Sequence, residues 1–238
     1  MALPRTVSPE VLDHLPPDDP RAVASRRDLR RVHRVMGTRA ILHRALRQAA
    51  AGRPPQRILE LGAGDGTLLL RVAADLAGRW PQAQLTLLDR QDLVEARTLD
   101  AYRALGWRAR PLQADVMDWA AQPPQRWDMV VSNLFVHHFD GAALQALLRG
   151  VAACADAFVA CEPRRGRLPL AGSRLIGLIG ANAVTRHDAV ASVHAGFRGQ
   201  ELSAAWPAAT GWQLHEYAAG LFSHCFVARR TTAPADAR

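Results

Sequence analysis

Apolar residues along this chain fall into short runs that alternate with segments of helical periodicity. Five runs predict buried strands, at 58–61, 84–89, 110–116, 127–134 and 157–161. Between them, apolar residues recur every three or four positions and predict amphipathic helices, at 67–77, 92–105 and 141–155. Two later segments alternate polar and apolar residues and predict a hairpin, at 212–217 and 222–228. Strands that alternate with helices indicate a parallel sheet that is covered on both faces.

The turn after the first predicted strand carries the most specific signal. Glycines stand at positions 62, 64 and 66, and the acids Glu60 and Asp65 flank them. Glycines let a ligand approach the backbone closely, and the helix that follows aims free N–H groups at the turn. The third glycine comes one position too early for the dinucleotide fingerprint, and carboxylates disfavour a diphosphate. A ligand that carries an amine or sulfonium group and ribose hydroxyls fits this turn better.

The pattern Glu-x-Gly-x-Gly-x-Gly resembles motif I of the class I S-adenosylmethionine (SAM) methyltransferases, and the acids that end the next two strands have the spacing of that family. The resemblance covers residues 56–164. It implies an α/β fold with a Rossmann-like, seven-stranded sheet, parallel except for an antiparallel last strand, with helices on both faces. It also implies the cofactor contacts: Glu60, Gly62, Gly64 and Asp65 with the methionine part, Asp89 with the ribose, Asp115 and Val116 with the adenine, and the backbone carbonyl of Asn133 with the amino-acid end.

We expect one methyltransferase domain over residues 1–238, with four parts: an N-terminal helical lid at 1–51, the SAM-binding core at 56–164, a substrate-facing insertion at 165–210 and the closing hairpin at 211–230. The lid shows apolar residues at helical spacing, and Gly37 is expected to break it into two helices. The insertion begins with an apolar helix at 168–179. Insertions at the carboxyl end of such a sheet face the ligand.

Methyl transfer is an in-line displacement that requires positioning, and a base when the acceptor is a hydroxyl or an activated carbon. His187, beside an aspartate in the insertion, is the first candidate for this base, and His138, which follows His137 after the fourth strand, is the second. The His187–Asp188 pair could also be a solvated histidine beside an aspartate that caps a helix. His138 could also only pack against the next helix or cap it. Arg39 and Arg186 are candidates for binding an acidic group. No metal is expected, since the displacement requires none.

The charge balance changes this picture little. The formal net charge is +8, and every basic residue other than histidine is arginine. Such a surface could recruit nucleic acid or an anionic membrane, although a G+C-rich gene explains an alanine-rich chain without lysine better. The chain shows no aromatic residues interleaved with a basic patch, and Asn133 lacks the Pro-Pro-aromatic continuation of the base-modifying enzymes, so no nucleic-acid partner is expected. The oligomeric state is open.

We expect no secretory signal, because the first residues lack its apolar core, and no membrane span, because no apolar run approaches the roughly 18 residues that a bilayer requires. The basic N-terminal helix leaves peripheral membrane contact open. The three cysteines have no metal-ligand spacing and are expected to be buried, reduced thiols of a cytoplasmic protein.

The first functional hypothesis is O-methylation of a small phenolic or polyketide-type compound. The Glu-Pro-Arg-Arg end of the fifth strand and the Thr-Arg-His-Asp segment are similar to bacterial methyltransferases associated with polyketide and phenolic-lipid pathways. The apolar residues 168–179 suit a lipid-like acceptor. C-methylation of a quinone-like ring is the second hypothesis. Two alternatives of other classes are an NAD-dependent oxidoreductase and a non-catalytic SAM-binding protein.

Overall fold

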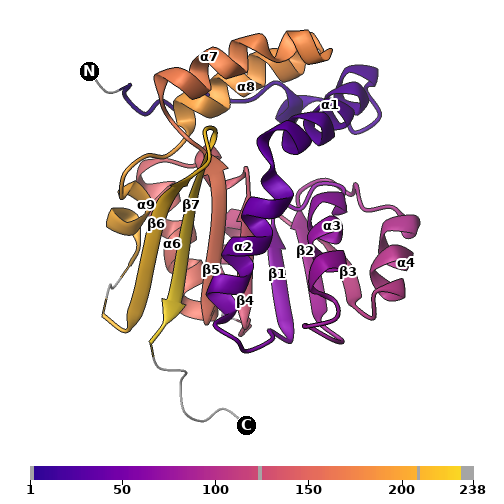
Figure 1. Ribbon diagram of the computed structural model, residues 1–238, viewed down its shortest axis with the longest axis vertical. Helices are drawn as coiled ribbons and strands as arrows, with labels where there is room; N and C mark the ends of the chain where they lie inside the picture. The colour runs from indigo at the N-terminus through magenta and orange to yellow at the C-terminus, as the bar shows by residue number, and fades with distance from the viewer. Residues whose placement is uncertain (1–2, 123–124, 208–209, 232–238) are drawn as a thin grey trace.

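The computed structural model describes residues 3–122, 125–207 and 210–231. Its strands are β1 (Arg57–Leu61), β2 (Gln84–Asp89), β3 (Arg108–Gln113), β4 (Met129–Asn133), β5 (Ala157–Pro163), β6 (Trp212–Ala219) and β7 (Ser223–Arg230). They form one sheet in the order β3-β2-β1-β4-β5-β7-β6 (Figure 1). Strand β7 is antiparallel to β5 and β6, and the remaining pairs are parallel. The predicted Rossmann-like sheet with an antiparallel last strand is confirmed.

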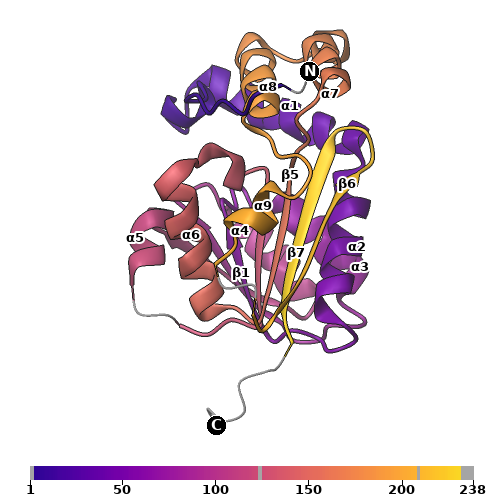
Figure 2. The same cartoon turned by 90° about the vertical axis from the view of Figure 1, so that its left-hand side faces the viewer.

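Helices bury both faces of this sheet. One face carries α2 (Thr38–Ala50), α3 (Thr67–Leu76) and α4 (Ala96–Ala104), and the other carries α5 (Val116–Ala121), α6 (Gly141–Cys154) and α9 (Glu201–Ala205) (Figure 2). Neighbouring residues of a strand point to opposite faces, so Ile58 belongs to one apolar core and Leu59 to the other. Because both faces are covered, the central strands β1, β4 and β5 are largely apolar runs, which is why the sequence predicted them well.

A third group of helices lies above the carboxyl ends of the strands (Figures 1 and 2). It consists of α1 (Pro20–Met36), α7 (Arg167–Leu175), the 3-10 helix η3 (Ile176–Ile179) and α8 (Ala183–Ala195). Gly37, with φ of 68°, separates α1 from α2, so the predicted break is present. Asp28 of α1 is 2% exposed and accepts a hydrogen bond of 2.7 Å from the N–H of Asn182, which fixes α1 to the start of α8.

The chain before α1 runs across this layer and includes the short 3-10 helix η1 (Leu12–His14). The N–H of Thr6 donates to the carbonyl of His194 at 3.1 Å. The N–H groups of Val11 and Leu12 donate to the carboxylate of Asp188 at 2.8 and 2.9 Å. Residues from both ends of the sequence therefore enclose the carboxyl edge of the sheet.

Most element bounds lie within two residues of the sequence prediction, but two in the predicted core differ by more. The third strand was expected at 110–116, but β3 ends at Gln113 and Val116 begins α5. Asp115 explains the difference, because its carboxylate accepts a hydrogen bond of 2.7 Å from the N–H of Met117 and caps this helix. The second helix begins at Ala96 rather than at 92. Within the described residues, no helix is long and apolar enough to cross a membrane.

Candidate functional site

The glycine turn between β1 and α3 has the backbone that the sequence predicted. Gly62 and Gly64 have φ of 66° and 56°, in the left-handed region that favours glycine. A Cβ on Gly62 would lie 2.3 Å from the Phe135 ring, whereas one on Gly64 would meet no atom within 4 Å. Asp89 at the end of β2 accepts a hydrogen bond of 2.8 Å from the N–H of Gly64. Gly62 is therefore required by protein packing, and Gly64 leaves its backbone open to a ligand.

Two buried acceptors beside this turn have no partner among the described residues: Oε2 of Glu60 and Oδ1 of Asn133. Both residues line a cavity of about 200 Å³, together with Gly62, Gly64 and Asp65. Burial, with the charges of Asp65 and Asp89, raises the pKa of Glu60 well above its usual value. Unpaired buried acceptors are costly, so these atoms suit a ligand that brings N–H or cationic groups. Five of the eight predicted cofactor residues thus meet at one cavity.

The remaining predicted cofactor residues lie outside this cavity. Asp89 holds the turn and also accepts from the N–H of Gln91 at 2.9 Å. Asp115 caps α5, and Val116 is buried at the start of that helix. The assignment of these three residues to ribose and adenine stays a prediction.

Helix α1 forms the opposite wall of the 200 Å³ cavity beside the glycine turn, which we call the cofactor cavity. Nη1 of Arg30 lies 3.0 Å from Oδ2 of Asp65, so an ion pair joins this helix to the glycine turn. His33, from the next turn of α1, also lines the cavity, and burial lowers its pKa to about 4. The N-terminal helix therefore stands where a lid over the cofactor was expected.

A buried chain of charged groups reaches the same cavity from β5. Glu162, at the end of β5, is fully buried and accepts hydrogen bonds from the N–H of Val136 at 3.0 Å and from Nδ1 of His137 at 2.8 Å. Nε2 of His137 lies 3.2 Å from Oε1 of Glu10, which also accepts from the hydroxyl of Ser192. Burial alone would lower the pKa of His137, but the two carboxylates raise it to about 9. His137 is therefore a cation held between two carboxylates at neutral pH.

The two histidines predicted as bases lie elsewhere. His187 is 60% exposed, with Nδ1 at 3.0 Å from Oδ1 of Asp188, and lies outside the cofactor cavity. His138, in the 3-10 helix η2 (Val136–His138), faces Asp13 at 3.3 Å; burial and the charge of His137 lower its pKa. The geometry does not bring either one to the cofactor residues, so their catalytic role stays a prediction.

The two arginines proposed as anion anchors also point elsewhere. Arg39 forms an exposed ion pair with Asp75, and Arg186 is exposed on α8.

Glu10, Ser192 and Leu134 belong to the cavity and were missed from the sequence. Glu10 stands in an irregular N-terminal segment where no periodicity marks it, and Ser192 is one polar residue of a helix. Leu134 has φ of 51° directly after β4, a strained conformation that no local sequence signal announces.

An apolar cavity of about 150 Å³ adjoins the cofactor cavity. Its walls come from α1, α7, η3 and α8, with Phe222 from the loop between β6 and β7. Leu29, Leu134 and Ser192 line both cavities, so the two meet at these side chains. Apart from two serines, every residue that lines it is apolar or glycine, which suits a hydrophobic ligand.

Glu10, His137 and His138 place possible metal-ligand atoms within 4.8 Å of one another. Both ring nitrogens of His137 already face carboxylates, and a protonated imidazole has no lone pair for a metal. We therefore describe this group as an ion-pair cluster.

Comparison with known proteins agrees with the geometry. Residues 58–156 match a family model described as a methyltransferase domain. Comparison with curated protein sequences finds no match.

Several solved structures share the fold. An O-methyltransferase family protein from Burkholderia thailandensis has a TM-score of 0.59 at 16% identity over 93% of this chain, which spans only 62% of that protein's length. The plantazolicin methyltransferase BpumL, in complex with a monoazolic desmethylPZN analogue and SAH, has a TM-score of 0.60 at 14% identity, covering 89% of this chain and 91% of that one. Magnesium protoporphyrin IX methyltransferase from Synechocystis PCC 6803, with bound SAM, has a TM-score of 0.51 at 14% identity, covering 87% and 84%. Identities this low establish the fold alone.

Proposed function

We propose that this chain, whose residues 58–156 match a methyltransferase domain, moves a methyl group from SAM to a hydroxyl of an apolar small molecule of phenolic or polyketide type. The observation that supports an apolar acceptor is the hydrophobic cavity that meets the cofactor cavity at Leu29, Leu134 and Ser192. A reaction between two bound molecules requires such a junction, because donor and acceptor must lie in line within contact distance.

The cofactor would lie against the glycine turn, with its methionine part near Glu60, Gly62, Gly64, Asp65 and Asn133. When bound there, SAM supplies an electrophilic methyl group. The unpartnered oxygens of Glu60 and Asn133 would accept hydrogen bonds from its amino group. The closed α1 wall, fixed by the Arg30–Asp65 ion pair, would keep water from the methyl group.

Glu10 is our candidate for the group that receives the acceptor's proton. It lines the cofactor cavity and contacts Ser192, which lies at the junction of the two cavities. Burial opposes its ionisation, but hydrogen bonds from His137 and Ser192 lower the pKa of Glu10, so it is a carboxylate at neutral pH. An acceptor hydroxyl at Ser192 would donate to this carboxylate, and the proton would pass to Glu10 as the O–CH3 bond forms, because the oxygen becomes strongly acidic once it is methylated.

His137 would act as a positioning residue in this scheme. Its imidazolium is fixed by Glu162 on one side and orients Glu10 on the other. His138 and His187 are the alternative bases from the sequence, and the same experiments separate them from Glu10.

The acceptor class is tested with SAM and a series of phenols that carry alkyl chains of increasing length, with the products identified by mass spectrometry. We expect kcat/KM to rise by up to about fourfold per methylene until the apolar cavity is full. A preference for polar acceptors, or no dependence on chain length, would contradict the proposal. Methylation on carbon rather than oxygen would identify the alternative reaction.

The role of Glu10 is tested with Glu10→Gln, which keeps the shape and removes the base. We expect kcat to fall by roughly 100-fold while the Kd for SAM changes little. Glu95→Gln, an exposed acid at the start of α4, is the matched control. Full turnover by Glu10→Gln, together with loss of turnover in His138→Ala or His187→Ala, would transfer the role to that histidine.

A further inference from the structure

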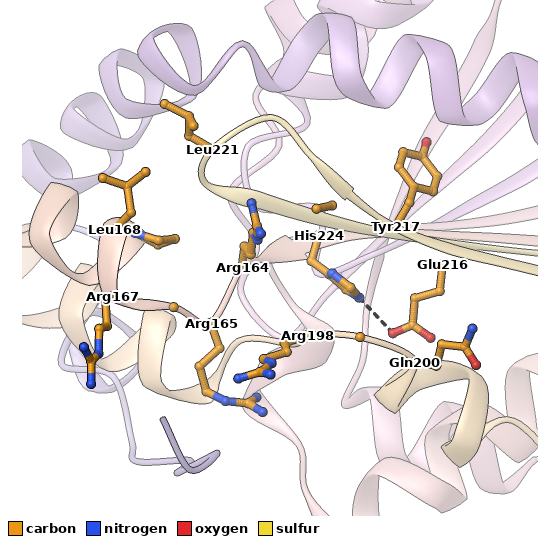
Figure 3. Close-up of a pocket in the computed structure, with 14 residues that line it drawn as sticks. Arg164, Arg165, Arg167, Leu168, Arg198, Gln200, Glu216, Tyr217, Leu221 and His224 are labelled. Atoms are coloured by element: carbon orange, nitrogen blue, oxygen red, sulfur yellow. Dashed lines mark hydrogen bonds and ion pairs between the residues drawn. The ribbon is translucent and has the colours of Figure 1, made fainter. Parts of the chain in front are cut away.

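A larger cavity, of about 660 Å³, lies beside the carboxyl end of β6 and the loop between β6 and β7 (Figure 3). Pro169 lines both this cavity and the apolar cavity that we propose for the methyl acceptor, and so separates the two. Four arginines line the larger cavity: Arg164, Arg165, Arg167 and Arg198. Neither the cofactor nor the acceptor described above requires this concentration of positive charge.

The carboxylates near these arginines already have hydrogen-bond partners within the protein. Arg165 is almost fully buried, donates to the carbonyl of Leu3 at 2.9 Å and forms an ion pair with Glu201. Glu216, with a side chain only 1% exposed, accepts from Nε2 of His224 at 2.8 Å and from the N–H of Ser203 at 2.7 Å. Figure 3 shows the His224–Glu216 pair at one side of the cavity, away from Arg167. These internal pairs leave the charges of the other three arginines uncompensated.

Those three guanidinium groups are available to a ligand. Arg167 and Arg198 are exposed, and their side chains make no hydrogen bond or ion pair with any residue in the described ranges. Within the part of the chain that the structure describes, the guanidinium of Arg164 makes only a 3.4 Å contact, with the carbonyl of Gly220. Helix α7 also begins at Arg167 without a side-chain cap, so free N–H groups at its start add positive potential. These arginines make the potential of the cavity that they line positive, which favours an anion there.

We propose that this cavity is an oxyanion site that binds a phosphate group, carried by a soluble phosphorylated molecule or by an anionic lipid headgroup. The planar guanidinium forms paired hydrogen bonds with phosphate oxygens, which makes arginine the preferred residue for such sites. A lipid is considered because Leu168 and Leu221, at the rim of the cavity, are 58% and 57% exposed and could contact acyl chains. Figure 3 places both leucines at the side of the cavity opposite Glu216.

Calorimetry with sodium pyrophosphate, against sodium sulfate at equal ionic strength, tests the site itself. We expect the wild type to bind pyrophosphate, and Arg167→Gln/Arg198→Gln to bind it at least tenfold more weakly, because each charge-assisted hydrogen bond contributes about a factor of ten. The double variant Arg47→Gln/Arg149→Gln removes the same charge from exposed positions on α2 and α6 and serves as the control. SAM affinity should be the same in all three proteins.

The absence of pyrophosphate binding by the wild type, or an equal loss in the control variant, would overturn the proposal. Both results are independent of the proposed methyl acceptor, because no acceptor is present in the assay.

Cosedimentation with phosphatidylglycerol vesicles, against phosphatidylcholine vesicles, separates the two phosphate sources. Binding to phosphatidylglycerol that is weakened in Leu168→Ser/Leu221→Ser and displaced by pyrophosphate would support a headgroup. Pyrophosphate binding without vesicle binding would support a soluble ligand. Vesicle binding that survives Arg167→Gln/Arg198→Gln and is not displaced by pyrophosphate would place the anion contact elsewhere and overturn the proposal.

Discussion

The buried ion-pair cluster at His137 predicts how stability depends on pH. The pKa of His137 is about 9 in the folded protein, against about 6.5 for a histidine of an unfolded chain. The folded state therefore binds this proton more tightly, and the stabilisation is complete below pH 6.5 and is lost as the pH rises through 9. The difference corresponds to about 3 kcal/mol of unfolding free energy. Solvent screens these charges little, because the side chain of His137 is only 2% exposed.

Urea unfolding at pH 7 and at pH 9.5 measures most of this contribution. With a urea slope of about 2 to 3 kcal/mol per molar, we expect the wild-type midpoint to be lower by about 0.8 to 1.2 M at the higher pH. His137→Gln keeps a donor for Glu162 but carries no charge, so its midpoint should change by much less over the same range. His187→Gln, at an exposed site, should behave as the wild type.

The neighbouring His138 does not confuse the measurement. Its pKa is lowered by burial and by the charge of His137, so the folded state binds its proton more weakly than the unfolded chain does. Its effect therefore falls below pH 6.5, outside the window. An equal change of midpoint in the wild type and in His137→Gln between pH 6.5 and 9.5 would refute the assignment of His137 as a stabilising cation.

Three further predictions concern the cofactor turn and the lid. Gly62→Ala should lose about 2 to 5 kcal/mol of stability by thermal unfolding, because it adds a clash with Phe135 to an unfavourable φ. Gly64→Ala has the unfavourable φ without the clash, so it should lose only about 1 to 2 kcal/mol of stability but weaken SAM binding. Equal losses of stability in the two variants would contradict the packing argument. Asp89→Ala should weaken SAM binding by roughly 10- to 100-fold in calorimetry, and unchanged affinity would remove the ribose assignment. Asp28→Ala should lower the free energy of unfolding by about 2 to 3 kcal/mol and increase proteolysis of α1, because it removes the buried hydrogen bond between α1 and the start of α8. An unchanged digestion pattern would show that other contacts hold α1 in place.

The sequence predicted the sheet more completely than it predicted the site. Strands buried on both faces are continuous apolar runs, and the glycines of the turn between β1 and α3 mark a local conformation, so both can be found from neighbouring residues. Glu162 was recognised only as the end of a strand. Its five backbone and side-chain donors come from residues 132–137, and nothing in the spacing shows that these groups converge on one carboxylate.

The catalytic prediction illustrates why such convergence is hard to foresee. His187 stood beside an aspartate in the sequence and their side chains do contact each other, but that aspartate is engaged by the N-terminal segment and His187 faces solvent. Glu10 reaches the cavity from a segment with no regular structure, 127 positions away from His137. Contacts of that range depend on the tertiary fold and leave no periodic trace in the chain.

The group of helices above the sheet, α1, α7, η3 and α8, also determines the order in which parts of the protein can fold during synthesis. The glycine turn and its supports lie within residues 57–133, whereas the acceptor cavity needs α1, α7, α8 and Phe222 together. A chain that leaves the ribosome from its N-terminus must hold α1 without its partner until α8 has been synthesised. The glycine turn is therefore synthesised before α8, and the apolar cavity is complete only when nearly the whole chain has emerged.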